Sequence, residues 1–144
     1  MIVLDAYALV AFLGAEPAPP EVERLLRGGD CVVSAVNLAE AVDVTCRVHG
    51  LALDEVRDVV RTLTLGGQLR VSSADEASGW RAADIRQSHY AKKTCELSLA
   101  DCFLIGAAAS PGDQIATSDP PVAAVARSER LQVIALPDST GRGP

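Results

Sequence analysis

Short apolar runs alternate with helix-forming segments along the whole chain. Runs without a charged residue occupy 2–4, 31–33, 114–117 and 131–136, and 69–71 forms a fifth, weaker candidate strand. Strands this apolar are buried on both faces, which favours a parallel sheet that helices cover on either side. The pattern therefore predicts an α/β protein, a three-layer α/β/α domain with a mostly parallel central sheet.

Capping and stop residues delimit the segments between these runs. Ser34 is a favourable N-cap for the helix that follows it, and Gly50 ends that helix. Pro111 and Gly112 end an apolar helix that begins at Ser98. The expected helices cover residues 7–13, 21–27, 35–48, 54–65, 75–89, 98–109 and 120–128, and a proline-rich loop covers 14–20.

Length and composition fit a single globular domain. The 144 residues allow one domain of ordinary size, which we place at 1–136, followed by a flexible C-terminal tail at 137–144. A hydrophobic content of 49% excludes a disordered chain. Charges interrupt every apolar stretch before the ~20 residues of a membrane span, so no membrane association is expected. Asp5 interrupts the first apolar stretch and no basic residue precedes it, which argues against a signal peptide.

Charge and cysteine content restrict the partners and the compartment. The net charge is −6, and the aromatic residues are one Trp, two Tyr and two Phe. This composition argues against a general nucleic-acid-binding protein, but not against an enzyme that contacts nucleic acid over a small area around a metal. The cysteines show no CxxC pair, so we expect them to be reduced residues of a cytoplasmic protein. They are Cys31, Cys46, Cys95 and Cys102.

Four largely apolar segments contain one charged residue each, and each of these residues is acidic. They are Asp5 in 1–15, Glu40 in 31–42, Asp101 in 97–112 and Asp119 in 114–126. A carboxylate in an apolar segment tends to be neutralised, paired or bound to a metal, because an isolated buried charge is costly. No Lys or Arg lies in these segments to pair with it locally.

The positions of these acids predict that they meet at one edge of the sheet. Asp5 and Asp119 follow strands, while Glu40 and Asp101 lie in the first two turns of helices, and ligands of parallel sheets gather at the carboxyl ends of the strands. Four carboxylates there would repel one another unless divalent cations held them. Oxygen ligands suit Mg²⁺ or Mn²⁺ better than Zn²⁺.

Each acid also has a simpler structural interpretation. Asp5 and Asp119 are good helix N-caps, and Asp101 can close a capping box with Ser98. Glu40 can be an exposed helix residue, as can Asp43 one turn later, which is otherwise an extra ligand candidate. Because an N-capping carboxylate can still bind a metal, the two interpretations do not exclude each other.

Four fragments of the chain recur in a known order and spacing. They are Met-Ile-Val-Leu-Asp5-Ala-Tyr-Ala-Leu, Ser34-Ala-Val-Asn37-Leu-Ala-Glu40, Leu97-Ser98-Leu-Ala-Asp101 and Ala116-Thr117-Ser-Asp119. Together they resemble the PIN domain and, in size, the VapC-type toxins of bacterial toxin–antitoxin pairs. The resemblance covers nearly all of residues 1–136.

The resemblance implies a metal-dependent endoribonuclease that uses Mg²⁺ or Mn²⁺ and leaves a 5′-phosphate and a 3′-hydroxyl. Its catalytic and metal-binding residues would be Asp5, Glu40, Asp101 and Asp119, with Ser98 and Thr117 in support. By analogy, Asp5 and Asp101 are the main metal ligands. Glu40 and Asp119 complete a second site or orient metal-bound water. The chain departs from the family at Tyr7, where a small and often hydroxylated residue is common.

The resemblance also implies partners. They are an RNA substrate, a second copy in a homodimer, and a cognate antitoxin protein that sends an arm, often with an Arg, toward the carboxylates. The helix after Tyr7 and the loop at 14–20 are candidate parts of the groove for that arm. The most basic stretch, 81–93, suggests that Arg86, Lys92 and Lys93 contact RNA phosphates near the acidic pocket, unless it is an ordinary solvated helix and loop.

Three alternatives stay open. The first is a PIN ribonuclease of RNA processing that has no antitoxin. The second is a metal-dependent phosphatase or a receiver-like domain, which Asp5-Ala6-Tyr7 and the absence of Lys beyond Lys93 disfavour. The third is a non-catalytic binding module of the same fold.

Overall fold

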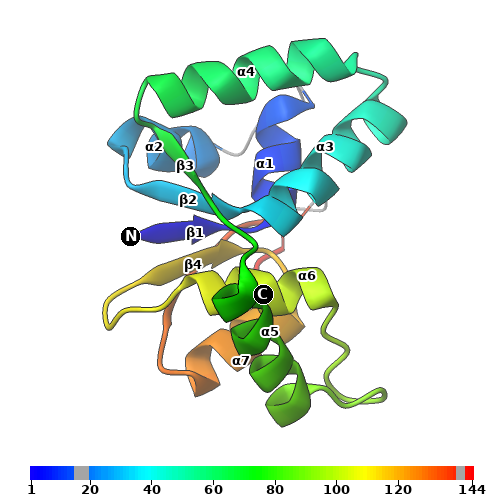
Figure 1. Cartoon of the computed structure of the whole chain (residues 1–144), viewed down its shortest axis with the longest axis vertical. Helices are drawn as coiled ribbons and strands as arrows, with labels where there is room; N and C mark the ends of the chain where they lie inside the picture. Colours follow the sequence, from blue (N-terminus) through cyan, green and yellow to red (C-terminus); the bar gives the residue numbers. More distant parts are fainter. Residues whose placement is uncertain (15–19, 139–141) are drawn as a thin grey trace.

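The computed structural model describes residues 1–14, 20–138 and 142–144, and in these parts of the chain a five-stranded parallel sheet lies between two layers of helices (Figure 1). The strands are β1 (Ile2–Leu4), β2 (Cys31–Ser34), β3 (Leu69–Ser72), β4 (Gln114–Thr117) and β5 (Gln132–Ala135). All strand pairs are parallel. The expected α/β/α fold is therefore confirmed, including the weak strand candidate at 69–71.

The helices follow the expected segments closely. They are α1 (Ala6–Leu13), α2 (Pro20–Gly28), α3 (Ala35–His49), α4 (Leu53–Leu65), α5 (Glu76–His89), α6 (Leu99–Ala107) and α7 (Pro120–Ser128).

The expected bounds differ from the observed ones by at most two residues. Two of the differences have a clear local cause, and one expectation is not tested. The loop predicted at 14–20 falls mainly on 15–19, which lie outside the described residues, but Pro20 begins α2, since proline is tolerated in a first helical turn. The helix expected to reach residue 109 ends at Ala107, because Ala108 leaves the helical conformation. The flexible tail at 137–144 stays a prediction, since 139–141 are not described.

The strand order is β3-β2-β1-β4-β5. The chain therefore builds outward from β1 in one direction and then returns to add β4 and β5 on the other side. Leu4 pairs with Ala116 in the register of β1 and β4, and the backbone N–H of Asp5 donates to the Ala116 carbonyl at 3.0 Å. Asp5 thus stands at the switch point between β1 and β4, where parallel sheets form their ligand crevice.

Alternate strand residues face the two helical layers. Leu4 and Val33 pack with α1, α2, α3 and α4, whereas Val3 and Ile115 pack with α5, α6 and α7. Figure 1 shows the first group of helices on one side of the sheet and the second group on the other. All four cysteines are free thiols, as expected. None of the helices described here has both the length and the apolarity that a membrane crossing requires.

Thr45 offers a test of the packing of α3. Its side chain is fully buried, and its Oγ1 has no hydrogen-bond partner among the described residues. Valine has the same shape without the hydroxyl, so we expect Thr45→Val to stabilise the fold by about 1 kcal/mol, measured by urea unfolding. A lower unfolding midpoint for Thr45→Val would contradict this assignment.

Candidate functional site

Asp5 is the most buried of the four predicted acids. It caps α1, and its side chain is 8% exposed. Oδ1 accepts a hydrogen bond of 3.3 Å from the Tyr7 backbone N–H, and Oδ2 accepts one from the Thr117 hydroxyl. The same hydroxyl accepts from the backbone N–H of Asp119 at 3.0 Å. The Thr117 hydroxyl therefore contacts both aspartates. This arrangement suits the supporting role that the resemblance implies.

The electrostatic environment of Asp5 opposes its charge. Burial raises the pKa of the Asp5 carboxyl above its ordinary value of 3.8, and the hydrogen bonds from Thr117 and Tyr7 act in the other direction. Asp101 and Asp119 raise the Asp5 pKa further by like-charge repulsion. Asp101 and Asp119 repel each other as well, so the three carboxyl groups lie close enough to interact electrostatically.

The carboxylates of Asp101 and Asp119 each accept a hydrogen bond from a backbone N–H at the N-terminus of their own helix. Asp101 and Ser98 form the expected capping box of α6, with bonds of 2.6 Å from the Ser98 N–H and 3.0 Å from the Asp101 N–H. Asp119 caps α7 by accepting from the Val122 N–H at 3.1 Å. Burial raises the pKa of Asp119, the Val122 N–H lowers it, and Asp101 raises it.

The fourth acid is Glu40, which lies on α3. It lies on an exposed part of the helix, in the second turn after the N-cap Ser34. Partial burial raises the pKa of the Glu40 carboxyl, and the charges of Asp101 and Asp5 raise it further. Glu40 therefore faces the other acids, although the four residues are far apart in the sequence.

The four carboxylates line one open pocket of about 430 Å³, as the sequence predicts. No Lys or Arg is among the described residues that line it. The remaining wall is mostly apolar and comes from α1, α3 and the start of α7: Ala6, Tyr7, Val10, Val44, Ser118 and Pro120. Tyr7, where the chain departs from the PIN pattern, therefore lies at the site.

The donor set fits a hard divalent cation, because it consists of oxygen atoms. The carboxylates do not yet converge, however. In the part of the chain that the structure describes, no three Asp, Glu, His or Cys side chains are close enough to hold one ion. Asp101 and Asp119 are bonded to their own helix ends instead. The residues thus suit a divalent cation in their donor atoms and in their position around one pocket. To coordinate the same ion, their side chains must move closer to one another.

The residues predicted to contact RNA lie on α5 and in the turn that follows it. Arg86 donates to the Leu97 carbonyl oxygen, and its guanidinium carbon lies 4.2 Å from the centre of the Tyr90 ring. Lys92 and Lys93 are exposed in the turn after α5. None of the three lines the carboxylate pocket.

Asp43 also stays apart from the pocket. It is exposed and pairs with Arg47 at 3.0 Å. The extra ligand that the sequence allowed at this position does not line the carboxylate pocket.

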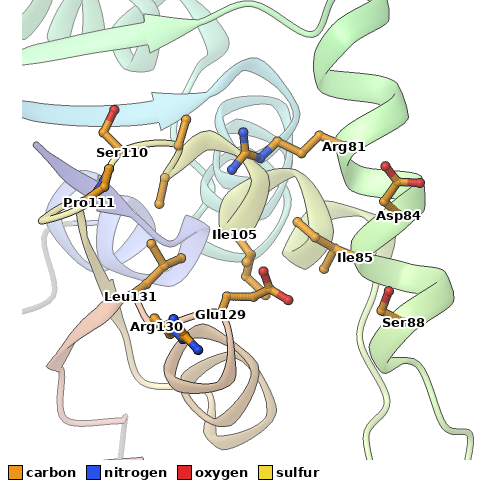
Figure 2. A pocket seen from close by; sticks show the side chains of 12 residues that line it. Arg81, Asp84, Ile85, Ser88, Ile105, Ser110, Pro111, Glu129, Arg130 and Leu131 are labelled. Atoms are coloured by element: carbon orange, nitrogen blue, oxygen red, sulfur yellow. The ribbon is translucent and has the colours of Figure 1, made fainter.

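Two features of the structure were missed by sequence reasoning. A second cavity, of about 660 Å³, lies between α5, α6 and the segment before β5 (Figure 2). Arg81 and Arg130 are among the residues that line it, and no local pattern in the sequence marks it. The other feature is Asn37, which is fully buried in the first turn of α3. The sequence feature that could have indicated its importance is a single amide side chain in an apolar segment with few charges.

Comparison with known proteins establishes the family. The sequence profile of the PIN domain matches residues 2–134. The chain belongs to the PIN domain family. No curated protein matches this PIN domain in sequence.

Solved structures resemble this PIN domain at low sequence identity. One is a structure of FitAB bound to an IR36 DNA fragment, with a TM-score of 0.66, 20% identity, and coverage of 93% of this chain and 94% of that chain. Another is a crystal structure of FitAcB from Neisseria gonorrhoeae, with a TM-score of 0.64, 21% identity, and coverage of 93% and 96%. Likeness at this identity establishes the fold.

The raised pKa of Asp5 gives a pH-dependent test. Because folding raises this pKa, the metal-free protein loses stability as the pH rises from the ordinary Asp value through the folded one. Asparagine cannot ionise. We therefore expect metal-free Asp5→Asn to be more stable than the wild type at pH 7 by about 1 kcal/mol, with the difference shrinking below pH ~4.

Thermal unfolding across this pH range measures the effect. Asp43→Asn is the matched control, because it removes an exposed carboxylate that has an Arg partner, and we expect it to change stability little. Equal pH profiles for Asp5→Asn and the wild type would contradict the assignment.

Proposed function

We propose that this PIN domain is a Mg²⁺- or Mn²⁺-dependent endoribonuclease that hydrolyses RNA and acts as the toxin of a toxin–antitoxin pair. The main support is the pocket in which Asp5, Glu40, Asp101 and Asp119 meet without a Lys or Arg in its described lining. PIN domains are generally nucleases, and they typically use divalent metals.

The residues have distinct tasks in this proposal. When bound, the metal acidifies a water molecule and stabilises charge on the scissile phosphate. Asp5 and Asp101 are the main ligands, and Glu40 and Asp119 complete the site. Thr117 keeps Asp5 oriented through its hydroxyl, and Ser98 does the same for Asp101 through the capping box.

A protein partner is part of the proposal. FitAB, which resembles this chain in fold, is a DNA-bound complex, and the sequence resembles VapC-type toxins, so we propose an antitoxin partner. The apolar wall formed by Tyr7, Val10 and Val44 next to the carboxylates suits an arm that carries apolar residues. We also propose a homodimer. An RNA-processing enzyme without an antitoxin would share the pocket, and the presence of a neighbouring antitoxin gene separates the two.

Removing a main ligand should abolish cleavage. We expect Asp5→Asn and Asp101→Asn to lower Mn²⁺-dependent RNA hydrolysis at least about 100-fold, because metal stabilisation of the transition state is worth several kcal/mol. Gel analysis of a labelled RNA pool measures this. EDTA should abolish the wild-type activity, and Mn²⁺ should restore it.

The control for these variants is again Asp43→Asn, which should keep its activity. Full activity in folded Asp5→Asn would falsify the assignment of the site. RNA cleavage that persists in EDTA would contradict the metal dependence.

The basic turn after α5 has its own test. If Lys92 and Lys93 contact phosphates, the double change Lys92→Glu and Lys93→Glu should reduce the salt dependence of RNA binding by about two units of log–log slope. Arg57→Glu on α4, in the opposite helical layer, is the control and should leave the slope unchanged (Figure 1). An unchanged slope in the double variant removes these lysines from the RNA interface.

A further inference from the structure

Asn37 joins the two helices that carry Glu40 and Asp101. Its side chain is fully buried in the first turn of α3. Its Nδ2 donates a hydrogen bond of 3.2 Å to the carbonyl oxygen of Ala100, in the first turn of α6. The two residues are 63 positions apart, so this bond connects separate elements and is not part of a local turn.

Ser34, the N-cap of α3, fixes the orientation of this amide. The Ser34 hydroxyl donates to Asn37 Oδ1, and it accepts from the Asn37 backbone N–H at 3.0 Å. With its oxygen engaged by Ser34, the amide directs its NH₂ group at Ala100. Both ends of the buried amide therefore have a partner.

A carboxylate-bearing residue lies close to each end of the hydrogen bond between Asn37 and Ala100. Glu40 follows Asn37 by three residues, and residues at this spacing lie on the same side of a helix. Asp101 directly follows Ala100 in the chain. Like-charge repulsion between Glu40 and Asp101 acts to separate the two helix ends, and the Asn37 bond opposes that separation. An apolar side chain would fill the space but would leave the two ends free to shift.

We propose that Asn37 is a positioning residue: its bond to Ala100 sets the separation of Glu40 and Asp101 and thereby the affinity of the pocket for Mg²⁺ or Mn²⁺. This inference rests on the metal site of the proposed function. It extends the function to a side chain that does not line the pocket and acts only through the helices that carry the ligands.

The test is Mn²⁺ binding to the full chain, with free Mn²⁺ quantified by EPR. Leucine branches at the same carbon as asparagine and makes neither bond, so we expect Asn37→Leu to weaken Mn²⁺ binding about 10- to 100-fold. Thr45→Val is the matched control: it changes another buried polar side chain of α3, which does not line the pocket, and should leave the affinity unchanged. If Asn37→Leu does not fold, Asn37→Ser replaces it.

A second background separates positioning from a general structural role. In Glu40→Gln the ligand that Asn37 positions has lost its charge, so Asn37→Leu should change the Mn²⁺ affinity less than about threefold there. An equal loss in both backgrounds, or no loss in the wild-type background, overturns the role of Asn37 and leaves the metal site standing. Absence of Mn²⁺ binding by the wild type overturns both.

Discussion

A buried carboxylate between two adjacent parallel strands is the constraint on which this site depends. Asp5 follows β1 directly, and the register with β4 brings Thr117 beside it. Burial disfavours the Asp5 charge, and hydrogen bonds from the Thr117 hydroxyl and the Tyr7 N–H offset part of that cost. Since the Thr117 hydroxyl also accepts from the Asp119 backbone N–H, the strand pair positions two acids of the pocket through one hydroxyl.

Helix capping explains how three of the four acids tolerate one another. Asp5 caps α1, Asp119 caps α7, and Asp101 closes a box with Ser98 at the start of α6. A carboxylate gains from the positive end of a helix, which compensates part of the repulsion among the acids. Each capping bond also holds a carboxylate at its own helix, and this keeps Asp5, Asp101 and Asp119 from converging on a single point within the pocket they share.

The acids were predictable because each is the one charge in a largely apolar segment, and the strand pattern gave the edge at which they meet. The contacts of Arg86 were not predictable in the same way. The basic stretch predicts phosphate contacts, but it does not indicate that Arg86 donates to the Leu97 carbonyl and lies over Tyr90. The partner of Asn37 was hidden for the same reason, because a side chain's contact with a distant backbone carbonyl leaves no local pattern in the sequence.

Capping alone does not account for the acidic pocket. Serine and asparagine cap helices about as well as aspartate, and Ser34 and Ser98 cap helices in this chain. Burial is the main cause of the raised pKa of Asp5, and neutral caps at the other positions would avoid the repulsion that raises it further. Glu40 caps no helix, yet it faces the same acids. Keeping all four acids therefore costs stability in the metal-free fold. Binding of a cation to the folded state would offset that loss of stability by mass action. The arrangement therefore favours a metal site over a set of acids that only cap helices.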